Sequence, residues 1–124
     1  MKLQGRIAVV TGASRGIGKA IAMALAKEGC ALGLMARTEK TLSETAQACR
    51  EFGSTVFALP IDLESPLAAV EGLKLLTREL GGLDILVNNA GTGASGSIED
   101  LSIDDYDRVM NLNLRSVIGL CKQA

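Results

Sequence analysis

Residues 11–18 read TGASRGIG, a glycine-rich segment that leaves few folds open to this chain. The segment follows a short apolar run from Arg6 to Val10 and leads directly into a helix-like pattern. Glycines let the backbone turn tightly and approach a phosphate, while the free N–H groups of a first helical turn point at that phosphate. We therefore predict a strand, a phosphate-binding turn and a helix in this order.

The spacing of the glycines distinguishes between kinds of phosphate loop. A P-loop has four residues between its first glycine and a Gly-Lys-Ser/Thr ending, whereas five residues separate Gly12 from Gly18-Lys19 here. Ala20 also takes the place of the hydroxyl residue that would bind magnesium. The segment is therefore not the P-loop of a kinase or a GTPase, and it also differs from the GxGxxG spacing.

The rest of the chain alternates strand-like apolar runs with amphipathic helices. We predict strands at 6–10, 30–36, 55–59 and 84–87, and helices starting near 17, 38, 66 and 104. Such alternation indicates a parallel sheet with right-handed crossovers. Residues 1–124 are thus predicted to form a single α/β domain, a Rossmann-type doubly wound parallel sheet. With about four strands and four helices it is incomplete, since the full sheet has six strands.

The end of the second predicted strand bears on the choice of dinucleotide. In such folds an acidic residue about 20 positions after the glycine loop binds the ribose 2′-OH of NAD, whereas an arginine accommodates the 2′-phosphate of NADP. Arg37 and Arg15 would bind that phosphate, because guanidinium is a bidentate phosphate donor. This pattern favours NADP(H). The alternatives are two solvated arginines, or Glu39 as the acidic residue.

Two motifs together resemble one enzyme family. Residues 11–18 match TGxxxGxG at every fixed position, and residues 88–91 read NNAG. Both are typical of the short-chain dehydrogenase/reductase family, and residues 2–12 look like those of 3-oxoacyl-thioester (acyl-carrier-protein) reductases. The resemblance covers essentially the whole chain but only about the first half of a family member.

The resemblance implies which residues contact the cofactor. They are Gly12, Ser14, Arg15, Gly16, Ile17, Gly18, Arg37, Asp62, Leu63, Asn88, Ala90 and Gly91. Asp62 matches the acidic residue that contacts the adenine, and Ser65-Pro66 already supplies the cap and first residue of the next helix. The residues of the NNAG motif are expected to keep the cleft clear and to hold the central strands together.

The last predicted helix carries Asn113 in the middle of an apolar face. That face consists of Tyr106, Val109, Met110, Val117, Leu120 and Cys121. A buried amide without partners costs about 1–3 kcal/mol, so Asn113 should have a specific role. That role is either a core hydrogen bond or, by the resemblance, that of the active-site asparagine, which helps to hold a water in a proton relay.

A second apolar edge of this helix has two interpretations. Leu112, Leu114 and Ile118 form the edge, and family members commonly dimerise through this helix, so we expect a homo-oligomer of the complete protein. The alternative is that these residues cover core that lies outside this chain.

The resemblance also implies a proton donor, a Tyr-x-x-x-Lys pair with a serine, in which the lysine lowers the tyrosine pKa. The single tyrosine, Tyr106, is followed four residues later by Met110 and precedes Asn113. From the resemblance we predict that the complete protein is an NADP(H)-dependent carbonyl reductase, with a 3-oxoacyl thioester as the candidate substrate. Because Tyr106 cannot belong to the Tyr-x-x-x-Lys pair, we expect this chain alone to be inactive. The alternative is a truncated chain that binds a nucleotide or a family partner.

Composition limits the partners and the compartment. A net charge of −1 and 48% apolar residues leave no basic surface for nucleic acid or an anionic membrane. No apolar run approaches the ~18 residues of a membrane span, and the start lacks the apolar run of a secretory signal. Three cysteines without a CxxC pair and the absence of histidine predict reduced thiols, no metal site and a cytoplasmic location.

Overall fold

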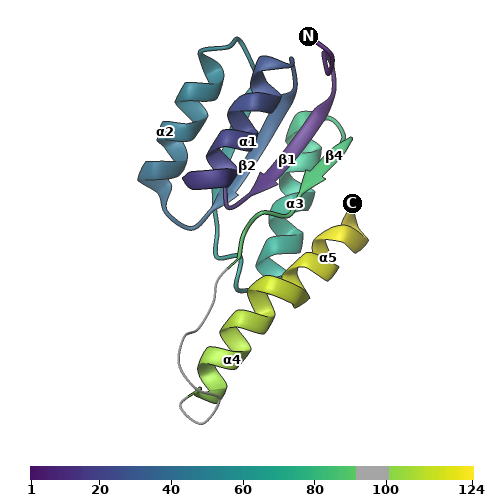
Figure 1. The fold of residues 1–124 in the computed structure, drawn as a ribbon. Helices are drawn as coiled ribbons and strands as arrows, with labels where there is room; N and C mark the ends of the chain where they lie inside the picture. The colour runs from purple at the N-terminus through teal and green to yellow at the C-terminus, as the bar shows by residue number, and fades with distance from the viewer. Residues whose placement is uncertain (92–100) are drawn as a thin grey trace.

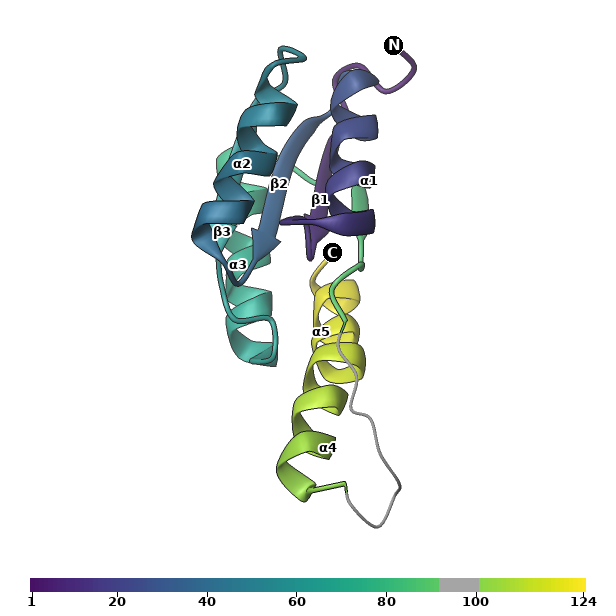
Figure 2. The ribbon, with the colours of Figure 1, turned by 60° about the vertical axis from the view of Figure 1, so that its left-hand side comes forward.

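The computed structural model describes residues 1–91 and 101–124, and in these parts of the chain a four-stranded parallel sheet carries helices on both faces (Figures 1 and 2). The strands are β1 (Ile7–Thr11), β2 (Ala31–Ala36), β3 (Val56–Pro60) and β4 (Ile85–Val87). The helices are α1 (Gly16–Lys27), α2 (Glu39–Arg50), α3 (Pro66–Leu80), α4 (Ile103–Met110), the π-helical segment η1 (Asn111–Arg115) and α5 (Ser116–Gln123). The predicted α/β doubly wound architecture is confirmed.

The strand order is β3-β2-β1-β4, so the chain reverses its direction of travel across the sheet at β1. β1 pairs in parallel with β2, where Ile7 lies opposite Ala31, and with β4, where Ala8 lies opposite Ile85. Both inner strands are almost entirely buried, as expected of parallel strands covered on two faces. The reversal places a crevice beyond the carboxyl ends of β1 and β4, where doubly wound sheets bind ligands.

Alternate residues of β1 face two separate cores. Val10 packs on the α1 and α2 side, with Ala22 and Leu42, whereas Val9 packs on the α3 and α5 side, with Leu73. Strand geometry explains this division, because successive side chains point to opposite faces of a sheet. Both cores hold the strands so that their carboxyl ends meet at one edge.

The predicted helix boundaries agree with the structure at α3. Pro66 occupies its first turn, the Ser65 hydroxyl accepts a hydrogen bond from the Ala68 N–H at 3.3 Å, and Gly81 ends the helix in the left-handed conformation. The cap is therefore Ser65 and not Asp62. Within the described parts of the chain, every helix is too short or too polar to span a bilayer.

The last helix differs from its prediction. One regular helix was expected, but η1 interrupts it, and its i→i+5 hydrogen bonds shift the side-chain register. The face that packs on α3 and the sheet carries Leu112, Ser116 and Leu120, while Tyr106 and Asn113 are exposed. The predicted burial of Asn113 is therefore wrong for this structure, since the 3.6-residue repeat assumed for it does not hold. Together α4 and α5 extend past the carboxyl ends of the strands (Figures 1 and 2).

Candidate functional site

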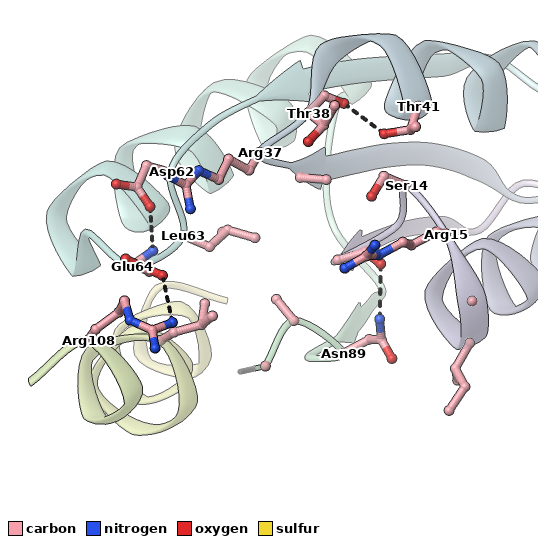
Figure 3. A pocket seen from close by; sticks show the side chains of 17 residues that line it. Ser14, Arg15, Arg37, Thr38, Thr41, Asp62, Leu63, Glu64, Asn89 and Arg108 are labelled. Carbon is pink, nitrogen blue, oxygen red and sulfur yellow. Dashed lines mark hydrogen bonds and ion pairs between the residues drawn. The ribbon is translucent and has the colours of Figure 1, made fainter. Parts of the chain in front are cut away.

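A cleft of about 720 Å³ opens beyond the carboxyl ends of the strands (Figure 3). All four strand ends contribute to it, and the last helix closes its far side. Its lining residues are Gly12, Ser14, Arg15, Gly16, Ile17, Ala36, Arg37, Thr38, Thr41, Asp62, Leu63, Glu64, Asn89, Ala90, Gly91, Arg108 and Leu112. The cleft thus lies at the position that the doubly wound topology favours for a ligand.

The glycine loop between β1 and α1 forms one wall of the cleft. Gly12 has a φ of +66°, and a Cβ built on it would lie 2.9 Å from the Ala90 Cα. Gly18 is buried beneath the loop, where a Cβ would lie 2.1 Å from the Gly12 carbonyl oxygen. Only glycine fits at either position: Gly18 lets the loop pack on α1, and at Gly12 the backbone faces the cleft without a side chain in between.

The N-terminus of α1 belongs to the same wall of the cleft. Arg15 is its N-cap residue, and among the described residues no side chain caps the helix and no acidic residue lies in its first turn. The N–H groups of a first turn and the helix dipole attract an anion. This end of the cleft is therefore suited to a phosphate group.

The loop after β4 is joined to the glycine loop by hydrogen bonds. The Thr11 hydroxyl accepts bonds from the Asn89 N–H at 3.1 Å and the Ala90 N–H at 3.0 Å, and it donates to the Val87 carbonyl at 3.4 Å. The Asn89 amide nitrogen donates to the Gly12 carbonyl oxygen at 3.1 Å. These bonds fix the floor of the cleft between β1 and β4.

The end of β2 and the start of α2 form the basic side of the cleft. Arg37 directly follows β2 and is exposed, and the Thr41 hydroxyl donates to the Thr38 carbonyl oxygen at 3.3 Å. Arg15 lines the same cleft from the glycine loop. In Figure 3 the two guanidinium groups lie on separate sides of the cleft, with Arg37 directed toward Asp62 and Leu63.

The loop after β3 forms the opposite end. Leu63 is buried and Leu112 is half-buried, so this end has an apolar floor, and an Asp62 carboxylate oxygen accepts a hydrogen bond from the Glu64 N–H at 3.0 Å. Glu64 also forms an ion pair with Arg108 of α4, with 3.7 Å between oxygen and nitrogen. An apolar floor beside a carboxylate suits a flat heterocycle with an amino group.

A sequence model described as short chain dehydrogenase matches residues 6–124. The chain belongs to the short-chain dehydrogenase family. A rhamnolipid-biosynthesis 3-oxoacyl-[acyl-carrier-protein] reductase of Pseudomonas aeruginosa is 39% identical over 121 residues, which are 98% of this chain and 47% of that protein. The chain thus spans about half the length of the curated relatives it matches.

Solved structures of the family show the same fold. A short chain dehydrogenase from Burkholderia cenocepacia in complex with NADP has a TM-score of 0.97 and 38% identity, over 100% of this chain and 51% of that one. An NAD⁺-bound xylitol dehydrogenase has a TM-score of 0.91 and 32% identity, over 99% of this chain and 48% of that one. The four-stranded sheet described above therefore matches about half of each of these solved structures.

Most residues that were expected to contact the cofactor line one cleft. Gly18 and Asn88 do not line it: Gly18 packs beneath the glycine loop, and the Asn88 side chain donates to the Cys121 sulfur at 3.4 Å. Asn113 also lies outside the lining, and its Oδ1 is 3.4 Å from a Cβ built on Gly91. The structure therefore brings Asn113 beside the NNAG loop without placing it in the cleft.

Several lining residues were missed by the sequence analysis. Asn89 stands inside the NNAG motif, so the motif itself offered a signal for it. Thr38 follows the predicted arginine, and its place at the start of the next helix was a second signal. Glu64 and Arg108 had no such signal, because nothing in their local sequence shows that they form an ion pair across 44 positions.

The two buried thiols, Cys30 and Cys49, lie in the core and outside the lining of the cleft. Burial raises the pKa of Cys30 and of Cys49 above the usual thiol value. Both thiols therefore stay protonated at neutral pH, which favours a structural role for them.

Proposed function

We propose that this chain supplies the NADP(H)-binding part of a carbonyl reductase. The reaction passes a hydride between the nicotinamide and a small-molecule carbonyl or alcohol substrate. The single observation that carries the proposal is one cleft that is lined by a glycine loop, by the uncapped start of α1 and, on separate sides, by two arginines (Figure 3). A pyrophosphate fits the loop, because backbone N–H groups and the helix dipole favour anions there.

The choice of NADP(H) over NAD(H) rests on the end of β2. Ala36 is buried and Arg37 follows it into the cleft, so the ribose 2′-position would meet a guanidinium and no carboxylate from this strand end. The B. cenocepacia relative was solved with NADP, whereas the xylitol dehydrogenase was solved with NAD⁺. The family thus accepts both cofactors, and Arg37 is the group that supports NADP(H) in this chain.

The remaining parts of the cofactor have candidate partners of their own. Asp62 and Leu63 would hold the adenine, with Leu112 below it, and Ala90 and Gly91 leave room beside the ribose and nicotinamide. Gly18 and Asn88 would act indirectly, by supporting the glycine loop and the end of β4. When bound, NADPH supplies the hydride.

For the substrate we propose a 3-oxoacyl thioester, since the P. aeruginosa relative is named as a reductase of that substrate on acyl carrier protein. Asn113 would help to hold a water in the proton relay. Of the predicted apolar edge, Leu112 packs against the core instead, whereas Leu114 and Ile118 are 45% and 58% exposed. These two exposed side chains support a homo-oligomeric contact through this helix, in a protein that we expect to be cytoplasmic. Tyr106 is not the proton donor, because Met110 stands where the lysine is required.

One set of binding measurements tests the cofactor assignment. Arg37→Asp should weaken NADPH binding by about ten- to a hundredfold and leave NADH binding almost unchanged, because a charge-assisted phosphate contact contributes about 1.5–3 kcal/mol. Arg78→Asp is the matched control, since Arg78 is exposed on α3 and does not line the cleft. An unchanged ratio of the two affinities in Arg37→Asp contradicts the assignment.

A second function has one observation in its favour. The 124 residues contain no Tyr-x-x-x-Lys pair, so by themselves they would bind the nucleotide without turning it over. NADPH oxidation followed at 340 nm with a 3-oxoacyl thioester distinguishes the two. Turnover by this polypeptide would show that its proton donor is a group other than the pair.

A further inference from the structure

Buried polar side chains gather around the cleft. Among the residues that the structure describes, three polar side chains are buried, namely Thr11, Thr45 and Ser116. Each binds the backbone of a segment that lines the cleft: Thr11 binds the NNAG loop, and Ser116 donates to the Leu63 carbonyl oxygen at 2.6 Å. Thr45 donates to the Ser14 carbonyl oxygen of the glycine loop at 3.2 Å. The buried hydroxyls are therefore placed where they can fix the backbone segments that line the cleft.

Thr45 lies on an otherwise apolar face of α2. It is fully buried beside Leu42, Ala46 and Cys49, which belong to the core between α2 and the sheet. A buried hydroxyl needs a partner, because desolvation without one is unfavourable. Packing in this core would need only an apolar side chain, so the reason for a hydroxyl at this position lies in the groups that it binds.

The hydroxyl of Thr45 has two acceptors within reach. One is the Thr41 carbonyl oxygen at 3.3 Å, the bond to residue i−4 that a helical threonine commonly forms. The other is the Ser14 carbonyl oxygen, 31 positions away, which the hydroxyl reaches only because α2 packs against the glycine loop. Since Thr41 in turn donates to the Thr38 carbonyl, a line of threonines connects the loop with the basic side of the cleft.

We propose that Thr45 is a positioning residue that fixes the glycine loop against α2. The loop carries Ser14 and Arg15, and the start of α2 carries Thr38 and Thr41, so the bond sets the spacing of two walls of the cleft. A ligand whose phosphates contact both walls binds more tightly when the free protein already has that spacing, because less conformational entropy of the protein is then lost on binding. The inference rests on the proposed NADP(H) binding and adds a residue outside the lining to it.

The test compares three variants of the chain. Thr45→Val keeps the shape and removes the hydroxyl, and we expect NADPH to bind about three- to tenfold more weakly, the effect of one lost hydrogen bond. Thr45→Ser keeps a hydroxyl, and its dissociation constant for NADPH should lie within about twofold of the wild-type value. Ser54→Ala is the control, since the Ser54 hydroxyl donates to the Ala26 carbonyl oxygen at the same 3.2 Å, away from the cleft.

A second measurement needs no ligand. The N–H groups of Gly12 and Ala13 donate to the Met35 carbonyl oxygen at 2.8 and 3.4 Å, and their amide hydrogen exchange in the free protein should be faster in Thr45→Val and unchanged in Thr45→Ser and Ser54→Ala. Unchanged exchange together with unchanged NADPH affinity in Thr45→Val overturns the inference, as does an equal loss of affinity in Ser54→Ala. If the unchanged chain does not bind NADPH, the proposed function fails, and the exchange rates alone then decide whether Thr45 holds the loop.

Discussion

Replacing Thr11 by valine removes the bonds that join the NNAG loop to β1. The side chain is 1% exposed, and valine has nearly the same shape, so the change leaves no cavity. The Asn89 N–H keeps a second acceptor, the Val87 carbonyl oxygen at 3.1 Å, whereas the Thr11 hydroxyl is the acceptor found for the Ala90 N–H. In the valine variant the Ala90 N–H therefore loses its acceptor, and the Asn89 N–H loses one of its two acceptors. The Ala90 N–H is part-buried, so its loss of an acceptor should cost an amount toward the lower end of the about 1–3 kcal/mol of a buried donor. We therefore expect the free energy of unfolding to fall by about 1.5 kcal/mol.

Urea denaturation followed by far-UV circular dichroism measures this loss. Thr11→Ser is the matched control, because it keeps the hydroxyl and gives up one methyl group, which is worth about 0.8 kcal/mol. The valine variant should therefore be clearly less stable than the serine variant. If valine costs under about 0.5 kcal/mol, or no more than serine, the hydroxyl does not hold the loop and the reasoning is wrong.

Three further changes have defined outcomes. Gly18→Ala places a Cβ 2.1 Å from the Gly12 carbonyl oxygen, so NADPH titration should show affinity lost by at least about tenfold as the loop is displaced, and full affinity would contradict the packing. Ser116→Ala leaves the Leu63 carbonyl without its 2.6 Å partner and should lower the urea midpoint by the equivalent of about 1 kcal/mol. Burial raises the pKa of Cys49 above 9.0, so above that pH the folded state holds more protons than the unfolded state. Stability should then fall as pH rises past about 9, less steeply in Cys49→Ala, and an equal slope in both proteins would argue against this cause.

Much of the fold follows from local patterns in the sequence. The strand and helix boundaries come from apolar periodicity, and the start of α3 comes from Ser65-Pro66, whose cap the structure contains. Such features depend on neighbouring residues, so a single sequence reveals them. The glycine loop was predicted for the same reason, since its spacing is itself the signal.

The rest depends on contacts between distant segments. The π-helical turn at 111–115 changes the register of the last helix, and the exposure of Asn113 follows from a departure that apolar spacing does not show. The bond from Thr45 to Ser14 spans 31 positions and arises from helix packing. The Arg108–Glu64 ion pair likewise exists because α4 crosses the end of the cleft. These features belong to tertiary packing and could not be read from local sequence.

The most direct test of the central claim is the pair of dissociation constants for NADPH and NADH on one preparation of this chain. Because Arg37 follows the buried Ala36 into the cleft, we predict that NADPH binds at least about tenfold more tightly than NADH. Equal affinities, or tighter binding of NADH, would contradict the assignment of this cleft to NADP(H).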